Sequence, residues 1–296
     1  EKIPVPALIK KKAQKFIMGK ILEKVGAAVI INTDALLISI FVTTSMVGVY
    51  DNYRMILASA TTLLVMIMGS TGASIGNLSV KGDRRQFMDV FKAHNFITFF
   101  LTIIIANGFM LASHPFINLW IGGNFLFPRA TIILLVFNFF LMSVRQTGFL
   151  YSDGFGLSWH QRWKSIIESI LNLFFSLFFL IFFKLGVMGI LMGAILSSLL
   201  TVNWYEPYII YKHVLQQKYV GYIKYFAIQF LVFVMTLGIS IILDILLPST
   251  GFIVLICRAI LSLFISFFFV YLFYRKSKEF KSMVDILNKM RGKINE

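Results

Sequence analysis

The chain has 296 residues, of which 58% are hydrophobic and only 14% are charged, and its mean hydropathy is +0.82. Soluble proteins carry about 25% charged residues, so this composition excludes a water-soluble fold and indicates an integral membrane protein. The net charge of +15 would suggest nucleic-acid binding in a soluble protein. In a membrane protein, basic residues instead concentrate in cytoplasmic loops, and we expect no nucleic-acid partner.

Eight segments are long and apolar enough to cross a bilayer as helices. A hydrocarbon core about 30 Å thick needs about 20 residues at a rise of 1.5 Å each. Long stretches dominated by apolar residues and without a period of two, such as Leu171–Phe183, exclude membrane β-strands, which alternate apolar and polar residues. We therefore predict an all-α integral membrane protein with spans at 24–46, 53–79, 95–113, 129–150, 165–183, 187–204, 225–246 and 251–274.

Basic residues gather in every second connection between these spans. The opposite set of connections holds only Arg54, Arg129 and Lys184. The positive-inside rule then predicts that both ends of this chain are cytoplasmic. Residues 1–23 are expected to form a cytoplasmic amphipathic segment on the inner leaflet. The tail 275–296 is expected to be basic, helical and either attracted to anionic lipid or bound to a specific partner.

Polar residues inside the first two spans are candidates for function, because charges inside a bilayer are costly unless paired or hydrated. Asn32, Thr33 and Asp34 lie about two turns inside the first span. Asp34 is interpreted as an ion- or proton-responsive group, with a structural hydrogen bond to a neighbouring helix as the alternative. Arg54 opens the second span. It either extends outward to the interface or turns inward, where its fork of donors suits phosphate.

The fourth and fifth spans carry a second group of candidates. Arg145 lies near the cytoplasmic end of the fourth. In the fifth, polar residues at spacings of three and four share one helix face, namely Ser165, Glu168, Ser169, Asn172 and Ser176. Arg145 and Glu168 lie at similar depth, so we predict an interhelical pair. The pair either stabilises the packing of the two helices or lines a cavity.

Other polar positions are interpreted as structural. Gly189, Gly193 and Ser197 recur every four residues, which predicts close helix packing. Pro207 is expected to break or kink the sixth span, and Asp244 and Arg258 to be boundary or pairing residues.

No catalytic, nucleotide-binding or metal-ligand motif is apparent. The single cysteine, Cys257, excludes an internal disulfide, and the four histidines are scattered. The connections are too short for the catalytic loops of membrane transferases. We therefore expect a non-enzyme without a cofactor.

A set of short motifs resembles the bacterial polysaccharide flippases of the multidrug/oligosaccharidyl-lipid/polysaccharide exporter superfamily. The middle third of the chain carries Trp163-Lys164 at a helix start, Glu168 and Asn172 four residues apart, and Gly186-x-x-Gly189. Weaker matches are Asn32-Thr33-Asp34 followed by Val47-Gly48-Val49-Tyr50, then Trp120-Ile121-Gly122, and Pro207 followed by Tyr211-Lys212. The resemblance extends over nearly the whole chain.

The resemblance implies a MATE-like fold of two helical lobes around a central cavity. The chain begins at Glu1, without an initiator Met, and we expect it to be a piece of a longer protein whose first lobe precedes it. Residues 1–23 would be the inter-lobe segment, 24–219 the second six-helix lobe, 220–274 an extra helix pair and 275–296 the tail. Arg54 would occupy the position of a cavity arginine in relatives.

The function that the resemblance implies is translocation of undecaprenyl-pyrophosphate-linked oligosaccharides for capsule, O-antigen or a related surface polymer. Arg54 and Arg145 would hold the pyrophosphate. Further expected partners are membrane lipids, a coupling proton or Na⁺, a polysaccharide polymerase and glycosyltransferases. The alternatives are a drug/cation antiporter of the same superfamily, a membrane polymerase or transferase, and a scaffold that recruits glycosyltransferases.

Overall fold

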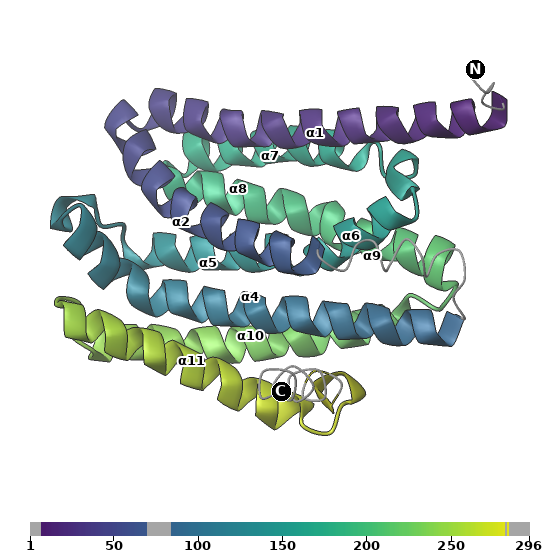
Figure 1. Ribbon diagram of the computed structural model, residues 1–296. Helices are drawn as coiled ribbons and strands as arrows, with labels where there is room; N and C mark the ends of the chain where they lie inside the picture. The colour runs from purple at the N-terminus through teal and green to yellow at the C-terminus, as the bar shows by residue number, and fades with distance from the viewer. Residues whose placement is uncertain (1–6, 70–83, 282, 284–296) are drawn as a thin grey trace, which may run out of the picture. The chain divides into compact units, whose positions relative to one another are not determined.

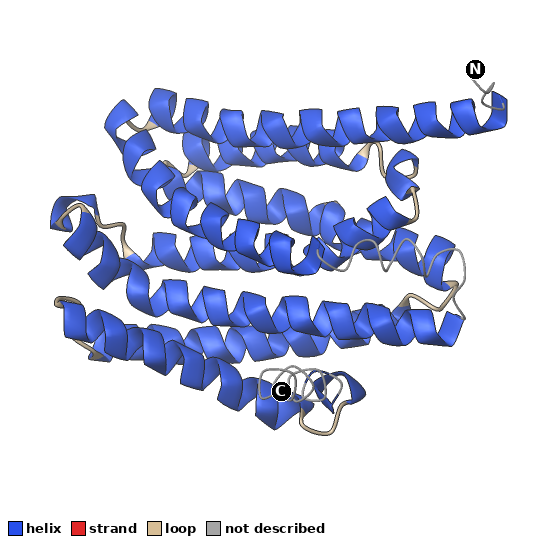
Figure 2. Cartoon of the chain, in the orientation of Figure 1, coloured by secondary structure: helices blue, strands red, loops and turns tan. Residues whose placement is uncertain are grey.

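The computed structural model describes residues 7–69, 84–281 and 283 (Figure 1). Helices make up nearly all of this described part, which contains no strand (Figure 2). Eight helical segments within it are long and apolar enough to cross a membrane. The chain is an all-α, multi-pass membrane protein, and the predicted fold class is confirmed.

The described helices follow one another along the chain without any intervening sheet. The longer ones are α1 (Ala7–Phe41), α2 (Thr44–Gly69), α4 (Arg84–Trp120), α5 (Arg129–Val144), α6 (Gln146–Gly154), α7 (Lys164–Phe182), α8 (Val187–Leu200), α9 (Val202–Ile210), α10 (Val220–Leu246) and α11 (Phe252–Tyr274). Three short turns connect some of them: the 3₁₀ turns η1 (Gly123–Phe125) and η2 (Leu157–Trp159), and the π-helical turn η3 (Tyr211–Leu215).

The first helix boundaries differ from those predicted. Helix α1 runs without interruption through residue 23 and ends at Phe41, and α2 already begins at Thr44. The turn between them is stabilised by Thr43, whose Oγ1 accepts a hydrogen bond from the backbone N–H of Met46 at 3.2 Å. This is the N-cap arrangement that starts a helix. Residues 70–79 of the predicted second span lie outside the described residues.

Two later spans are each divided into two helices. Helix α5 ends where Arg145 follows it, and α6 continues from Gln146. The span that contains Pro207 does not break at this residue, because Pro207 lies inside α9 and the interruption falls at Thr201. The alternative, a kink at Pro207, stays a prediction. At Thr201 the backbone leaves the helical region (φ −119°, ψ −83°), while Thr201 Oγ1 donates to the carbonyl of Ser197 at 2.6 Å. That bond gives a carbonyl in the last turn of α8 a partner.

The chain forms two compact units. Unit 1 contains α1, the start of α2, most of α6, and α7 to α9. Unit 2 contains the remainder of α2 together with α4, α5, α10 and α11. Residues 220–274, assigned from the sequence to an extra helix pair, thus belong to the same unit as α4 and α5.

In unit 1, glycines allow helix α7 to be approached closely on two sides. A Cβ at Gly26 of α1 would lie 2.6 Å from Cβ of Ser165, and one at Gly193 of α8 would lie 2.6 Å from the backbone nitrogen of Ser176. Helices α1 and α8 both pack on α7 (Figure 1). The predicted close packing at Gly193 is confirmed.

In unit 2, α4 is the central helix, and α5, α10 and α11 all pack on it. Buried amides and hydroxyls join these helices. Asn107 Nδ2 donates to Ser266 Oγ at 3.1 Å, and its Oδ1 accepts from Ser240 at 3.0 Å. Gln229 Nε2 donates to Asn95 Oδ1 at 2.9 Å. Interhelical hydrogen bonds of this kind stabilise membrane bundles by about 0.6–2 kcal/mol each.

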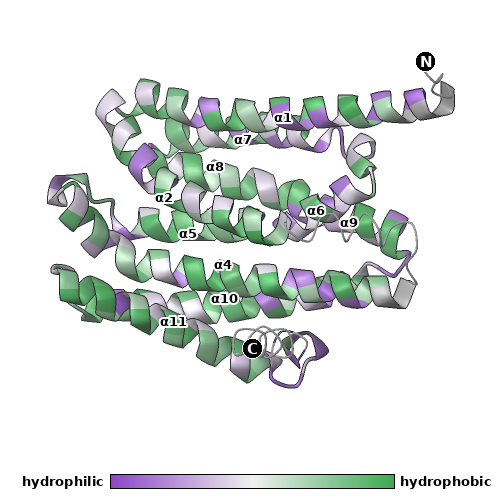
Figure 3. Cartoon of the chain, in the orientation of Figure 1, coloured by the Kyte–Doolittle hydropathy of each residue, from purple (hydrophilic) through white to green (hydrophobic). Residues whose placement is uncertain are grey.

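Large apolar side chains remain exposed along the spans. Phe182 and Leu246 are each 73% exposed and Ile253 is 77% exposed, and helices α10 and α11 are coloured mostly as hydrophobic in Figure 3. A soluble protein rarely shows so much exposed apolar surface. In a membrane protein, such apolar side chains face the acyl chains of the surrounding lipid.

Candidate functional site

Asp34 is a buried carboxylate in the membrane-spanning part of α1. Its residue is 8% exposed, and Oδ2 accepts a long hydrogen bond of 3.5 Å from the hydroxyl of Tyr50 on α2. Tyr50 was part of a motif in the sequence, but its contact with Asp34 was not predicted. The pair combines an ionisable group with a neutral donor inside unit 1, where the low dielectric strengthens such contacts.

Asn32 does not belong to the same surface as Asp34. Its side chain is exposed, and Nδ2 donates to the carbonyl of Ala28 in its own helix at 2.7 Å. Two residues along a helix correspond to a rotation of about 200°, so the two side chains leave α1 in nearly opposite directions. The structure therefore does not bring these two predicted site residues together.

Arg54 lies deeper in its helix than predicted. Because α2 begins at Thr44, Arg54 is ten residues inside the helix, about 15 Å along its axis. The expectation that Arg54 opens the span is therefore wrong. The side chain is 40% exposed, and its Nε lies 3.4 Å from Oδ1 of Asp51, one turn earlier. Among the described residues, Asp51 is its only ion-pair partner.

Arg145 lies between α5 and α6 and is 6% exposed. Its Nη1 contacts Sδ of Met142 at 3.4 Å. Arg145 belongs to unit 2 and Glu168 to unit 1, so the pairing of these two residues stays a prediction.

The predicted polar face of α7 is buried. Glu168 is 7% exposed and Asn172 is 1% exposed, and the other buried polar residues of this helix are Lys164, Ser165, Ser169 and Ser176. On the opposite side, Ile170 and Phe174 are 62% and 60% exposed. Oδ1 of Asn172 has no hydrogen-bond partner among the described residues. The face therefore retains hydrogen-bonding capacity inside the protein.

A cluster of charges that sequence reasoning missed surrounds the first residue of α7. Lys164 Nζ lies 2.6 Å from Oε1 of Glu206 on α9 and donates to Oε1 of Gln161, also at 2.6 Å. A second carboxylate, from Glu23 on α1, lies 3.6 Å away. Glu23 also pairs at 3.1 Å with Lys20, which in turn contacts Asp153. The signal available in the sequence was the equal depth of Lys164 and Glu206, each at the same end of its span.

Unit 2 contains a separate buried charge cluster at Asp244. Arg258 Nη1 lies 2.5 Å from one carboxylate oxygen, and Arg129 Nε lies 2.7 Å from the other. Asp244 and Arg258 are both fully buried, whereas the Arg129 side chain is 47% exposed. Arg258 also donates to the carbonyls of Leu111 and Leu247, at 2.9 and 2.7 Å. The pairing role predicted for Asp244 and Arg258 is confirmed.

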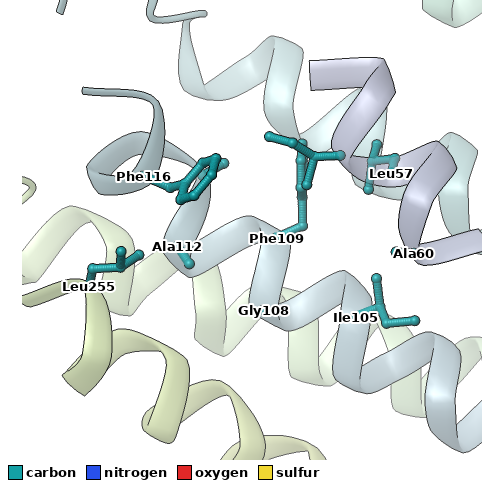
Figure 4. A pocket seen from close by; sticks show the side chains of 10 residues that line it. Leu57, Ala60, Ile105, Gly108, Phe109, Ala112, Phe116 and Leu255 are labelled. Atoms are coloured by element: carbon teal, nitrogen blue, oxygen red, sulfur yellow. The ribbon is translucent and has the colours of Figure 1, made fainter. Parts of the chain in front are cut away.

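Unit 2 also has an apolar cavity of about 240 Å³, lined by residues of α2, α4 and α11 (Figure 4). Its walls include Leu57, Phe109, Phe116 and Leu255, and Ser113 is the only lining residue with a polar side chain. Such a lining suits hydrocarbon and lacks the charged groups that would bind a phosphate or a sugar.

Within the described part of the chain, no three His, Cys, Asp or Glu side chains form a group that could hold a metal ion. Comparisons of the chain with protein-family models, with curated proteins and with solved structures find no match.

Proposed function

We propose that this chain is part of a flippase that moves lipid-linked oligosaccharides, with a pyrophosphate linkage, across the bacterial cytoplasmic membrane. In this proposal the lipid tail stays in the bilayer while the sugar and the pyrophosphate cross through a polar passage. Both ends of the chain would be cytoplasmic. The sequence resemblance described above supplies the substrate class.

The observation that carries the proposal is the position of Arg54. A guanidinium about 15 Å inside a membrane-spanning helix would be very costly in contact with lipid. The side chain nevertheless remains 40% exposed, and within the described part of the chain its ion-pair partner is Asp51, at 3.4 Å. An arginine has five N–H donors, so most of them remain free for the oxygens of a pyrophosphate. A polar passage next to Arg54 would keep its guanidinium hydrated and so lower the free-energy cost of this position.

Buried polar groups on other spans support the same proposal. Asp34 and the polar face of α7, with Glu168 and Asn172, place ionisable and hydrogen-bonding groups inside apolar helices. A protein that only anchors other proteins in the membrane has no need for such groups, which are expensive in hydrocarbon. A transporter of sugars and phosphates needs them to replace the hydration of its substrate.

The test replaces Arg54 with Gln in the full-length protein and measures surface polysaccharide in cells that lack the native copy. We expect polymer export to fall at least tenfold at equal protein level, with partial recovery in the Arg54→Lys variant. The control is Lys184→Gln, which removes a positive charge from an exposed connection. Undiminished export by the Arg54→Gln variant would exclude the proposed role of this residue.

A further inference from the structure

Cations and aromatic rings gather at one end of unit 1, around the turn η2. The guanidinium carbon of Arg162 lies 4.2 Å from the centre of the Trp159 ring, and Nη1 donates to the Trp159 carbonyl at 2.8 Å. Lys15 of α1 places its Nζ 5.5 Å from the centre of the same ring. These contacts hold two cations on one indole, a favourable cation–π arrangement.

Two histidines extend this group toward α9. The rings of His160 and His213 lie 4.6 Å apart between their centres, and both residues are exposed. The hydroxyl of Tyr205 donates to the carbonyl of His160 at 3.0 Å, which ties the loop after η2 to α9. Next to His213, Lys212 lies with Nζ 5.6 Å from the ring of Tyr208. We call Lys15, Trp159, His160, Arg162, Lys212 and His213 the basic–aromatic cluster.

The cations of this cluster lack acidic partners. No carboxylate lies within ion-pair distance of Lys15, Arg162 or Lys212 among the residues that the structure describes. Their neighbours Lys20 and Lys164 differ, because both are paired with Glu or Asp side chains. The cluster therefore presents positive charge that the described chain does not neutralise.

The cluster lies where three of the apolar spans begin or end. Span α7 begins at Lys164, the span that includes α8 and α9 ends at Leu215, and the first span begins at Ala13. Each cation of the cluster is within three residues of one of these limits. Trp163, 56% exposed, lies at the same limit. Exposed tryptophan next to basic residues is typical of the membrane–water interface.

From this arrangement we propose that the basic–aromatic cluster binds the phosphate of an anionic phospholipid from the surrounding leaflet. Arg162, oriented by Trp159, supplies a fork of N–H donors that matches phosphate oxygens. Lys15 and Lys212 add further positive charge, and the histidine rings add N–H donors. The exposed Trp163 would contact the glycerol and the upper acyl chains. This inference does not depend on the proposed transport function.

The test measures lipid binding by the purified full-length protein in a neutral detergent. Native mass spectrometry counts bound phosphatidylglycerol and phosphatidylcholine, and a titration gives the affinity for each. We expect phosphatidylglycerol to bind at least tenfold more tightly, and the Arg162→Gln variant to bind it about fivefold more weakly than the wild type, since each basic residue near the surface contributes about that factor.

The matched control is Lys24→Gln, which removes an exposed lysine from α1 outside the cluster. This control should bind phosphatidylglycerol as the wild type does. Equal weakening in Arg162→Gln and Lys24→Gln would overturn the proposal, because it would indicate only general attraction. If inorganic phosphate competed as well as the lipid, the lipid assignment would be wrong. Should Arg162→Gln fail to fold, the exposed pair His160→Ala and His213→Ala, which removes both rings with their N–H donors, carries the same expectation of weaker binding.

Discussion

Lys164 of α7 and Glu206 of α9 form an ion pair with a distance of 2.6 Å, and both side chains are only 2% exposed. The two residues are 42 positions apart in the chain, so the pair joins helices that are distant in sequence. Removing one member of a buried ion pair leaves an uncompensated charge, which costs far more than the pair itself contributes. The pair therefore makes the packing of α7 against α9 depend on both charges.

Replacing Lys164 with Met should lower the free energy of unfolding by about 3–5 kcal/mol. The Lys164→Met/Glu206→Gln double variant should lose less than the single variant, because no buried carboxylate is left without its ammonium. Thermal unfolding of the purified protein in detergent, followed by tryptophan fluorescence, measures both. A loss in Lys164→Met no larger than that in the exposed Lys184→Met variant would contradict this interpretation.

The two arginines that bind Asp244 should differ sharply in their importance for stability. Arg258 is fully buried, so Arg258→Gln should cost about 3–5 kcal/mol. Arg129 is 47% exposed, so Arg129→Gln should cost no more than about 1 kcal/mol. Both substitutions remove one positive charge next to the same carboxylate, so each serves as the control for the other. Equal losses in thermal unfolding would show that burial does not decide the contribution.

The close contact between α7 and α8 predicts opposite effects for two glycine substitutions. Gly193→Ala should destabilise the protein by about 1–3 kcal/mol, because its Cβ would overlap Ser176. Gly238→Ala in α10 meets open space and should stabilise its helix by up to about 1 kcal/mol. Melting temperatures of the two variants in the same detergent provide the comparison. A neutral Gly193→Ala variant would mean that the two helices are farther apart than described.

The opposite directions of Asp34 and Asn32 predict that only one of them matters for export. Under the proposed function, Asp34→Asn should reduce surface polysaccharide several-fold at normal protein level. Asn32→Ala should leave export unchanged, because Asn32 is exposed and donates to a carbonyl of its own helix. Tyr50→Phe removes the hydroxyl that donates to Asp34 and should give an intermediate reduction. Equal export by the Asp34→Asn and Asn32→Ala variants would argue against a role for Asp34.

Hydropathy and length sufficed to predict the all-α class and the number of spans, because a bilayer demands about 20 apolar residues per helix. The helix ends were harder. The turn at Thr43 lies in the run Phe41-Val42-Thr43-Thr44, which has no Gly or Pro to indicate a break. Helix α4 extends well before the predicted start at residue 95, through polar positions that resembled a loop. Asn95 itself is buried and accepts a hydrogen bond from Gln229 on α10.

The candidate site was predictable in part. The buried face of α7 follows from its three- and four-residue spacing, since that pattern fixes which residues share a side of a helix. The Lys164–Glu206 pair was not recognised, because Glu206 adjoins Trp204, Tyr205 and Pro207, which suggested only an interface position. Its recognition needed the fold to show that α7 and α9 approach each other at that end. Arg54 was placed at the membrane surface because the start of α2 was set nine residues too late.

The amide of Asn107 bridges α10 and α11 through Ser240 and Ser266, and this has a consequence for how the protein can be shortened. A version truncated after residue 219 would leave Asn95, Asn107 and Arg129 facing acyl chains without their bonding partners. Polar and charged groups without a hydrogen-bond partner have a high free-energy cost in hydrocarbon. The last two helices are thus a required wall of unit 2, and a trimmed variant should misassemble during insertion.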